Sequence, residues 1–299
     1  MGTTVKQIGT LQAYLDARKK TVNITLLKLL KNSGTYSRFK NLDASLKHTV
    51  LLEGKRLRPV LALMTYELFQ LKAGKNVLEA AAALELIHAG SLMLDDLPSM
   101  DNAGLRRGKK TNHVVFGDAT TILASAGLWV EAFHIIGSVD PYYVPKLISS
   151  TTDCMGKGGL ILGQYMDLFA FNKKQSLKDL RECYQLKTGS LFKLATTYGA
   201  VLGGASTAEQ NALEAFGNAY GIAYQIRDDI IDATESEASS GKDAHKDEQN
   251  NKPNYVSLLG LEGAKKALLT EMGSARKALT KIQKDTLRFE QLVDALSLT

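Results

Sequence analysis

Three aspartates close an apolar stretch of the sequence. Asp95 and Asp96 are adjacent at its end, and Asp101 follows after a turn at Pro98. Adjacent carboxylates raise each other's pKa unless a cation offsets their repulsion, and Mg²⁺ prefers oxygen-only ligands. The group therefore predicts a divalent-metal site, although one short motif of this kind is equally compatible with a solvated helix end.

A second acidic group, Asp228, Asp229 and Asp232, favours the metal interpretation. Asp228 and Asp232 are four residues apart, so they share one face of a helix, and Asp229 lies on a neighbouring stripe. The surrounding residues are mostly apolar, and Arg227 alone cannot neutralise three carboxylates. Two such groups facing each other would enclose divalent cations.

Basic residues gather at a predicted helix start. Gly54 interrupts the pattern before Lys55, Arg56 and Arg58, and Pro59 then opens an apolar helix at the first position, where proline is best tolerated. Cations at a helix start predict an anion site. The alternative is a basic turn exposed to water.

Further polar residues are candidates for the same chemistry. Arg106 and Arg107 lie in a loop ended by Gly108, and guanidinium groups suit phosphate oxygens. His88 precedes Asp95 by two helical turns, so both side chains point the same way. A lone histidine on an apolar helix is more often a core residue with its hydrogen bonds made. The two-turn spacing from Asp95 is what favours a functional role for His88.

The elements that must position these residues are helices. Few prolines, frequent Ala and Leu, and repeated helical periodicity predict an all-α fold with little or no sheet, in one domain over 1–299. Helices are expected over 77–94, 120–136 and 145–171, the last carrying Gln164 and Asp167.

A polar run over 233–260 is expected to be a loop that acts as a lid, since it is too long to be idle in a compact domain and too charged for a core. Lys242 and Lys252 provide it with charges that suit phosphate.

Composition bounds the partners and the compartment. The net charge of +6 suits an acidic partner, and because aromatic and basic residues are not interleaved, a small polyanion is favoured over nucleic acid. Cys154 and Cys183 are too few for a disulfide framework, and no charged-then-apolar leader opens the chain, which together predict a reducing cytoplasm. No run of about 18 apolar residues occurs, so no transmembrane segment is expected.

The two acidic groups occur in one order with GKRLRP, LRRG, KTG, YQIRDDIID and GKD…K…NY across residues 54–260, and in this the sequence resembles the trans-isoprenyl diphosphate synthases. The resemblance implies the all-α isoprenoid synthase fold, a helix bundle around a deep central cavity, and a homodimer. It implies a short-chain enzyme that joins isopentenyl diphosphate to an allylic diphosphate (dimethylallyl, geranyl or farnesyl). Three Mg²⁺ ions held by the two acidic motifs would grip the allylic diphosphate.

Residue by residue, the resemblance implies three sets of roles. The metal ligands would be Asp95, Asp96, Asp101, Asp228 and Asp232, with Asp229 acting through water. The isopentenyl diphosphate site would be Lys55, Arg58, His88 and Arg107. The allylic diphosphate site would be Arg106, Lys187, Thr188, Gln225, Lys242 and Lys252. The residues expected to act in catalysis are Asp95, Asp101, Asp228 and Lys187.

The sequence departs from the family pattern at three places. Glu53 stands where Gly is usual, Leu94 replaces a common His, and SAGLW over 125–129 differs from the usual GDALL. None of these removes a predicted ligand. Two rivals are a terpene cyclase, which lacks the second acidic motif with these basic partners, and a catalytically silent regulatory subunit, which should have lost aspartates that this chain keeps.

Gly90 and Ser91, about one turn before Asp95, bear on product length. In the family the product grows along this helix away from the metals, and a large aromatic residue here stops it at fifteen carbons. The small side chains predict that the cavity is open at this height of the helix. This favours twenty-carbon geranylgeranyl diphosphate over farnesyl diphosphate. Bulky residues that could supply a floor from elsewhere are Met93, Phe116 and Trp129.

Overall fold

The structure of the protein is a computed structural model, and it is described here for residues 10–32, 39–169, 176–239 and 252–298. Regular structure in these residues is helical, apart from one short hairpin. The all-α prediction is therefore confirmed.

The chain divides into two compact units. One comprises Met1–Ser149 with Tyr198–Gly204, and the other comprises Ser150–Thr197 with Ala205–Thr299. The division falls inside two helices, α7 (Val144–Met155) and α10 (Ser190–Gly203). That the whole chain forms a single domain stays a prediction.

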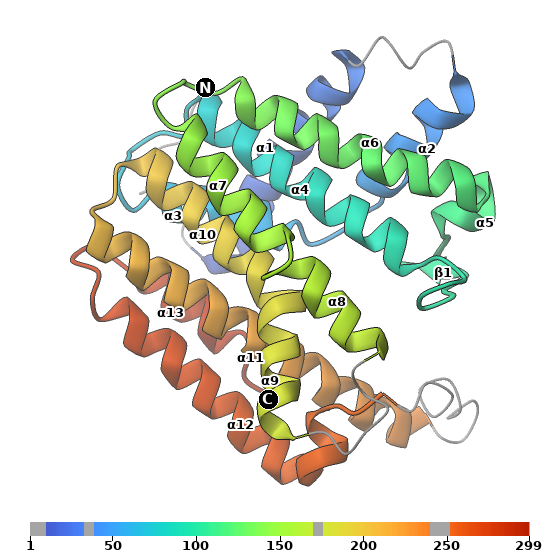
Figure 1. Ribbon diagram of the computed structural model, residues 1–299. Coiled ribbons are helices and arrows are strands. Elements are labelled where there is room, and N and C mark those ends of the chain that lie inside the picture. The colour runs from blue at the N-terminus through green and yellow to red at the C-terminus, as the bar shows by residue number, and fades with distance from the viewer. Residues whose placement is uncertain (1–9, 33–38, 170–175, 240–251, 299) are drawn as a thin grey trace. The chain divides into compact units, whose positions relative to one another are not determined.

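The first unit is organised around α4. Its helices are α1 (Leu11–Asn32), α2 (Lys40–Leu51), α3 (Leu57–Tyr66), α4 (Lys75–Asp95), α5 (Asn112–Phe116) and α6 (Asp118–Gly137), with the hairpin β1 (Leu105–Arg106) and β2 (Lys109–Lys110) between α4 and α5. α4 packs against α1, α2, α3 and α6, and it lies alongside α6 in Figure 1. Most of its side chains are buried, so it forms the core of this unit.

Two described helices, α4 and α6, are long and apolar enough to cross a membrane by length and composition alone. This is weak evidence, because buried core helices pass the same test, and 72% of the apolar window of α4 is buried. Only 39% of the α6 window is buried, and its exposed face carries Ile122, Leu123 and Val130.

The second unit is built on two long helices. Beside parts of α7 and α10 it contains α8 (Leu160–Phe169), α9 (Leu177–Tyr184), a π-helical turn η4 (Gln185–Gly189), α11 (Thr207–Ser239), α12 (Tyr255–Leu279) and α13 (Leu287–Asp294). α11 and α12 pack along each other (Figure 1). A Cβ at Gly221 of α11 would lie 2.6 Å from the Cα of Gly189, so glycine lets η4 approach α11 closely.

Two sequence predictions about these elements are wrong. The helix predicted over 145–171 is two helices, α7 and α8, because the glycine-rich stretch 156–159 interrupts it. A Cβ at Gly159 would lie 2.1 Å from the carbonyl oxygen of Cys154, so the turn between the two helices brings the backbone closer than any other residue permits.

The loop predicted over 233–260 is partly helical, since α11 continues to Ser239 and α12 begins at Tyr255. Lys242 lies outside the described residues, and the role of this segment as a lid stays a prediction.

Candidate active site

The first acidic group lies at the C-terminal end of α4. Asp95 is the last residue of α4, and the loop that follows folds back over it: Asp101 N donates to Asp95 O at 2.9 Å, and Ala103 N donates to Asp96 O at 3.1 Å. A helix C-terminus carries a partial negative charge, so these carboxylates repel one another and the helix dipole. This end of α4 therefore requires nearby positive charge.

Arg106 supplies part of that charge. Its Nε donates to both oxygens of Asp96, at 3.0 and 2.9 Å, and its Nη2 donates to Oδ1 at 2.6 Å. Burial lowers the pKa of Arg106, but the bond and charge of Asp96, followed by the charges of Asp95 and Asp101, raise it overall. Asp96 is only 2% exposed and is engaged by Arg106, so its role as a metal ligand stays a prediction.

The hairpin positions Arg107. Arg107 (φ 53°) and Gly108 (φ 73°) form its two-residue turn, where positive φ matches the twist of the strands. A positive φ costs a non-glycine residue about 1–3 kcal/mol and persists where contacts hold it. Here Arg107 Nη1 donates to Glu53 O at 3.0 Å, and a Cβ at Gly54 would lie 2.1 Å from the same nitrogen. The hairpin is thereby tied to the segment that precedes α3.

Lys55 and Arg58 lie at the start of α3, as predicted. Arg58 Nη1 is 3.2 Å from His88 Nε2. Arginine only donates, so Nε2 of a neutral imidazole accepts, and the ring proton is on Nδ1. The pKa of His88 is well below its usual value. Burial is the largest cause, and the positive charges of four arginines add to it: Arg58, Arg107, Arg106 and Arg56. The residues predicted for isopentenyl diphosphate thus lie in one region of the first unit.

Three details of this segment differ from the sequence interpretation. Arg56 does not belong with the other cations, because it is buried and its Nη1 bonds to Glu85 Oε1 at 2.6 Å. Pro59 is the third residue of α3 rather than the first, but it still falls in the turn where backbone N–H groups have no helical partner. The side chain of Glu53 is 93% exposed, so glutamate fits where the family usually has glycine.

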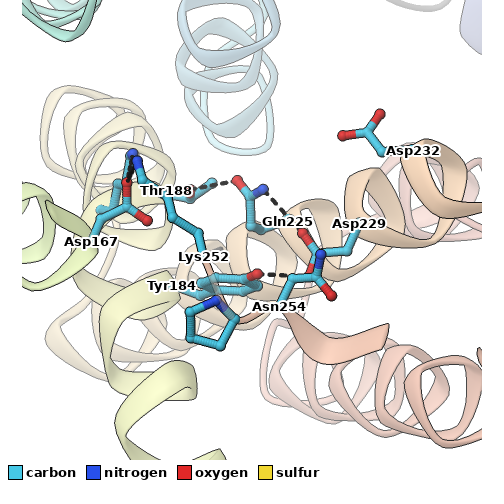
Figure 2. A pocket seen from close by; sticks show the side chains of 10 residues that line it. Asp167, Tyr184, Thr188, Gln225, Asp229, Asp232, Lys252 and Asn254 are labelled. Carbon is cyan, nitrogen blue, oxygen red and sulfur yellow. Dashed lines mark hydrogen bonds and ion pairs between the residues drawn. The ribbon is translucent and has the colours of Figure 1, made fainter. Parts of the chain in front are cut away.

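The second acidic group lies on α11 beside a cavity of about 220 Å³ in the second unit (Figure 2). The cavity is lined by Asp167, Tyr184, Lys187, Thr188, Gln225, Asp229, Asp232, Lys252, Pro253 and Asn254. The structure thus brings together four predicted allylic-site residues and one predicted metal ligand. Asp228 is next to Asp229 on α11 and is partly exposed.

Asp167 holds two of the predicted lysines (Figure 2). Its Oδ2 accepts from Lys187 Nζ at 2.6 Å and from Lys252 Nζ at 2.9 Å. Burial raises the pKa of Asp167, but the two lysines more than offset this and lower it overall. Two ammonium groups are thereby kept together at the cavity.

Asp229 is engaged by protein groups on both of its oxygens. Tyr184 Oη donates to its Oδ2 at 2.6 Å, Tyr255 N donates to the same oxygen at 3.1 Å, and Gln225 Nε2 donates to Oδ1 at 3.4 Å. Burial raises the pKa of Asp229 to about 6, while these bonds oppose the shift. Asp229 therefore connects α9 and α11 to the start of α12, and the carboxylate of Asp232 stands apart from this network in Figure 2.

Local backbone features explain why Lys187 and Thr188 line the cavity. Both are in the π-helical turn η4, a feature often found at functional sites. A Cβ at Gly163 would lie 2.2 Å from Lys187 N, so glycine lets α8 touch η4, and Asp167 follows one turn later on α8. Thr188 Oγ1 donates to Gln225 Oε1 at 3.0 Å.

Three residues that line the cavity were missed from the sequence, Tyr184, Pro253 and Asn254. Asn254 caps α12, since its Oδ1 accepts from Ser257 N at 2.8 Å and its own N donates to Ser257 Oγ at 2.9 Å. A cap residue followed three positions later by a second polar residue is a readable signal of a helix start. Tyr184 has no such signal, because its partner Asp229 is 45 residues away.

The chemistry of the acidic residues fits Mg²⁺. All predicted ligands are carboxylates, which suit Mg²⁺ better than zinc. Within the part of the chain that the structure describes, no three Asp, Glu, His or Cys residues form a group that could hold an ion by themselves. Mg²⁺ keeps several waters and commonly shares one or two carboxylates with substrate phosphates, so a site completed by a diphosphate is consistent with this finding.

The prediction that the space beside Gly90 is open is wrong. A Cβ there would lie 2.6 Å from Nε1 of Trp129, which comes from α6 and donates to Ile87 O at 3.1 Å. Ser125, one turn earlier on α6, donates from Oγ to Gly90 O at 2.8 Å. Both residues belong to the SAGLW segment that departs from the family pattern. The small residue on α4 thus makes room for an indole from the neighbouring helix.

Fold and site together define a class of protein. Its members are all-helical and combine aspartate motifs with basic side chains placed for anionic ligands.

The family described as Polyprenyl synthetase matches residues 39–289. The chain is 36% identical over 278 residues to farnesyl diphosphate synthase of Geobacillus stearothermophilus, covering 90% of this chain and 91% of that protein. It is 39% identical to the chloroplastic geranylgeranyl pyrophosphate synthase of Capsicum annuum, covering 74% of this chain and 61% of that protein.

A crystal structure of an FPP/GFPP synthase from Zymomonas mobilis superimposes with a TM-score of 0.84 at 29% identity, covering 96% of this chain and 99% of that one. The chain belongs to the polyprenyl synthetase family. It is a prenyltransferase that makes a short-chain prenyl diphosphate. The family acts on isopentenyl diphosphate and allylic diphosphates and generally uses Mg²⁺.

Proposed function

We propose that this enzyme condenses isopentenyl diphosphate head to tail with an allylic diphosphate, using three Mg²⁺ ions held by Asp95, Asp96, Asp101, Asp228 and Asp232. The observation that carries the proposal is the paired placement of Lys187 and Lys252 on Asp167 beside the α11 aspartates. Two ammonium groups at a cavity next to carboxylates suit a metal-bound diphosphate.

The side chains bind and orient both substrates. Lys187, Thr188, Gln225 and Lys252, with Arg106 and Lys242, are proposed to hold the allylic diphosphate, and Lys55, Arg58, His88 and Arg107 to hold isopentenyl diphosphate. When bound, Mg²⁺ supplies the positive charge that lets the allylic C–O bond break.

The reaction needs no nucleophilic side chain. As the C–O bond breaks, its electron pair leaves with the diphosphate, and the double bond of isopentenyl diphosphate forms the new C–C bond. The proton then lost from the isopentenyl unit goes to the departing diphosphate. Lys187 and Lys252 stabilise the developing charge, and the placement of the two substrates supplies the remaining rate enhancement.

The experiment that tests this function is incubation of the enzyme with Mg²⁺, isopentenyl diphosphate and each allylic primer. We expect elongation of at least one primer and no activity after chelation of Mg²⁺. An enzyme that consumes an allylic diphosphate without isopentenyl diphosphate would contradict the proposal.

For product length, the position of Trp129 favours the fifteen-carbon farnesyl diphosphate, in place of the twenty-carbon product that Gly90 alone suggested. The indole covers Gly90 and is fixed by a hydrogen bond to α4. We expect little elongation of farnesyl diphosphate by the unmodified enzyme and longer products from Trp129→Ala. Ser125→Ala, which keeps the indole, is the matched control, and twenty-carbon product from the unmodified enzyme would contradict the assignment.

A homodimer is proposed from the exposed apolar face of α6. Leu123 and Val130 are 66% and 68% exposed on that face, and burial against a second copy would remove them from water. Leu123→Glu with Val130→Glu is expected to give a monomer in sedimentation analysis. Leu269→Glu, at a leucine of α12 that is 63% exposed, is the matched control. An unmodified enzyme that sediments as a monomer would rule the proposal out.

A cytoplasmic location is also proposed. Cys154 and Cys183 are free and buried, and burial raises the pKa of their thiols to about 11 and 12. Unlinked thiols suit a reducing compartment.

A further inference from the structure

One buried ion pair lies next to the proposed isopentenyl diphosphate site without belonging to it. Arg56 Nη1 donates to Glu85 Oε1 at 2.6 Å, and both side chains are only 4% exposed. A buried pair of this kind is weak evidence for stability, because replacing both partners by apolar residues is often neutral. Its position directly beside predicted ligands therefore suits a role other than stability.

The guanidinium of Arg56 joins three helices. Besides Glu85 on α4, its Nε donates to Asn23 Oδ1 on α1 at 3.0 Å. Its Nη2 donates to two carbonyl oxygens at the end of α2, Val50 O at 2.7 Å and Leu52 O at 2.8 Å. The side chain is thus fixed from several directions, and few other residue types could replace it, because only arginine offers so many donors in one plane.

The same residue sets the backbone at the start of α3. Arg56 is the N-cap residue, with φ 52° and ψ 33°, a left-handed conformation that non-glycine residues avoid. Such a conformation persists where surrounding contacts stabilise it. The hydrogen bonds of the Arg56 guanidinium stabilise it here. The directions in which Lys55 and Arg58 leave the backbone therefore depend on Arg56.

Arg58 and Arg56 contact the same face of α4. Glu85 and His88 are three residues apart on α4, so they are neighbours on its surface. Arg56 bonds to Glu85, and Arg58 lies 3.2 Å from His88. The start of α3 is therefore attached to α4 at two points, one through a buried pair and one through residues predicted to bind substrate.

We propose that the Arg56–Glu85 pair is a positioning element for isopentenyl diphosphate, which fixes Lys55 and Arg58 relative to His88 before the substrate binds. The proposal rests on the proposed function. Holding several like charges in one place in advance lowers the cost of binding a diphosphate, and small displacements of such groups are expensive. The pair acts through its neighbours and does not itself contact the substrate.

The test is the double variant Arg56→Met with Glu85→Met, which removes both charges together. We expect the KM for isopentenyl diphosphate to rise about tenfold or more, with the KM for the allylic substrate unchanged. The melting temperature is expected to fall, because Met leaves the oxygens of Asn23, Val50 and Leu52 without their donor, so both KM values are measured on folded protein.

The matched control is Arg181→Met with Glu271→Met. That control removes another arginine–glutamate pair, also at 2.6 Å, from the second unit. It is expected to leave both KM values unchanged.

Arg56→Lys keeps the positive charge but loses the planar fork, so it provides a second test if the double variant does not fold. It is expected to raise the same KM, and by less. A folded variant whose KM for isopentenyl diphosphate stays within about twofold, or whose two KM values rise together, would overturn the inference.

Arg58→Ala in the same assay separates this result from a failure of the proposed function. If Arg58→Ala raises the KM for isopentenyl diphosphate and the Arg56 and Glu85 variants do not, the inference alone is wrong. If Arg58→Ala leaves that KM unchanged, the proposed position of the substrate site is wrong, and the inference is overturned with it.

Discussion

The two regions expected to bind diphosphates hold their cations in different ways. In the first unit, Arg58 contacts a neutral His88 and Arg107 bonds to a backbone carbonyl. In the second unit, Lys187 and Lys252 are both bonded to the carboxylate of Asp167. The described bonds of the first region thus go to an imidazole and a carbonyl, whereas both lysines of the second region share one carboxylate. A diphosphate that binds to these lysines competes with the anion that already holds them.

The largest expected effect comes from removing one of the carboxylates that are proposed to hold Mg²⁺. Asp95→Ala and Asp228→Ala should each lower kcat by orders of magnitude while the protein stays folded, because each ligand holds charge at the leaving diphosphate. Steady-state rates and circular dichroism together provide the measurement. The control is Asp153→Ala, at an exposed aspartate of α7. Near-normal turnover in either variant would contradict a metal role for that aspartate.

Alanine substitutions of the cations test the comparison between the two regions directly. Arg58→Ala and Lys55→Ala should raise the KM for isopentenyl diphosphate more than that for the allylic substrate, and Lys252→Ala should do the reverse. Loss of a charge-assisted hydrogen bond of about 1.5–3 kcal/mol corresponds to roughly tenfold to hundredfold in KM. Lys265→Ala, at a lysine on the surface of α12, is the control. Equal effects on both substrates would assign the residue another role.

A smaller effect is expected from adding bulk to α4. Gly90→Tyr should destabilise the enzyme by about 1–3 kcal/mol, because the indole of Trp129 already occupies the adjacent space. Denaturant unfolding measures the change. In the combined variant with Trp129→Ala, part of the lost stability should return. Unchanged stability of Gly90→Tyr would show that the wall opens in solution.

The smallest effect concerns the protonation of His88. Its pKa in the folded protein lies well below 6.5, so the unfolded state takes up this proton first as the pH falls. Folding stability is therefore lost below about pH 6.5, by at most about 1.4 kcal/mol for each pH unit. His88→Gln, which cannot titrate, should lose less stability between pH 7.5 and 5.5. Equal losses in both proteins would show that His88 takes up its proton as readily in the folded state as in the unfolded state.

The sequence was sufficient for the helical fold class, and it named candidate residues for the site. The spacing of Asp228 and Asp232, the glycine before Lys55 and the KTG motif are local patterns, and local patterns fix which side chains share a helix face or a turn. The resemblance to a known family, rather than these patterns, identified four of the residues that line the cavity of the second unit as candidates for a diphosphate site.

Only the tertiary structure decided the partners of these residues. Arg56 bonds to Glu85 across 29 residues, Trp129 covers α4 through a bond across 42 residues, and Lys252 reaches Asp167 across 85 residues. Periodicity gives the face of one helix but not the helix that packs against it, so a small residue such as Gly90 predicts space without showing what fills that space. For this reason the sequence by itself determined the chemistry, whereas packing decided which arginine is buried and whether the wall of α4 is open.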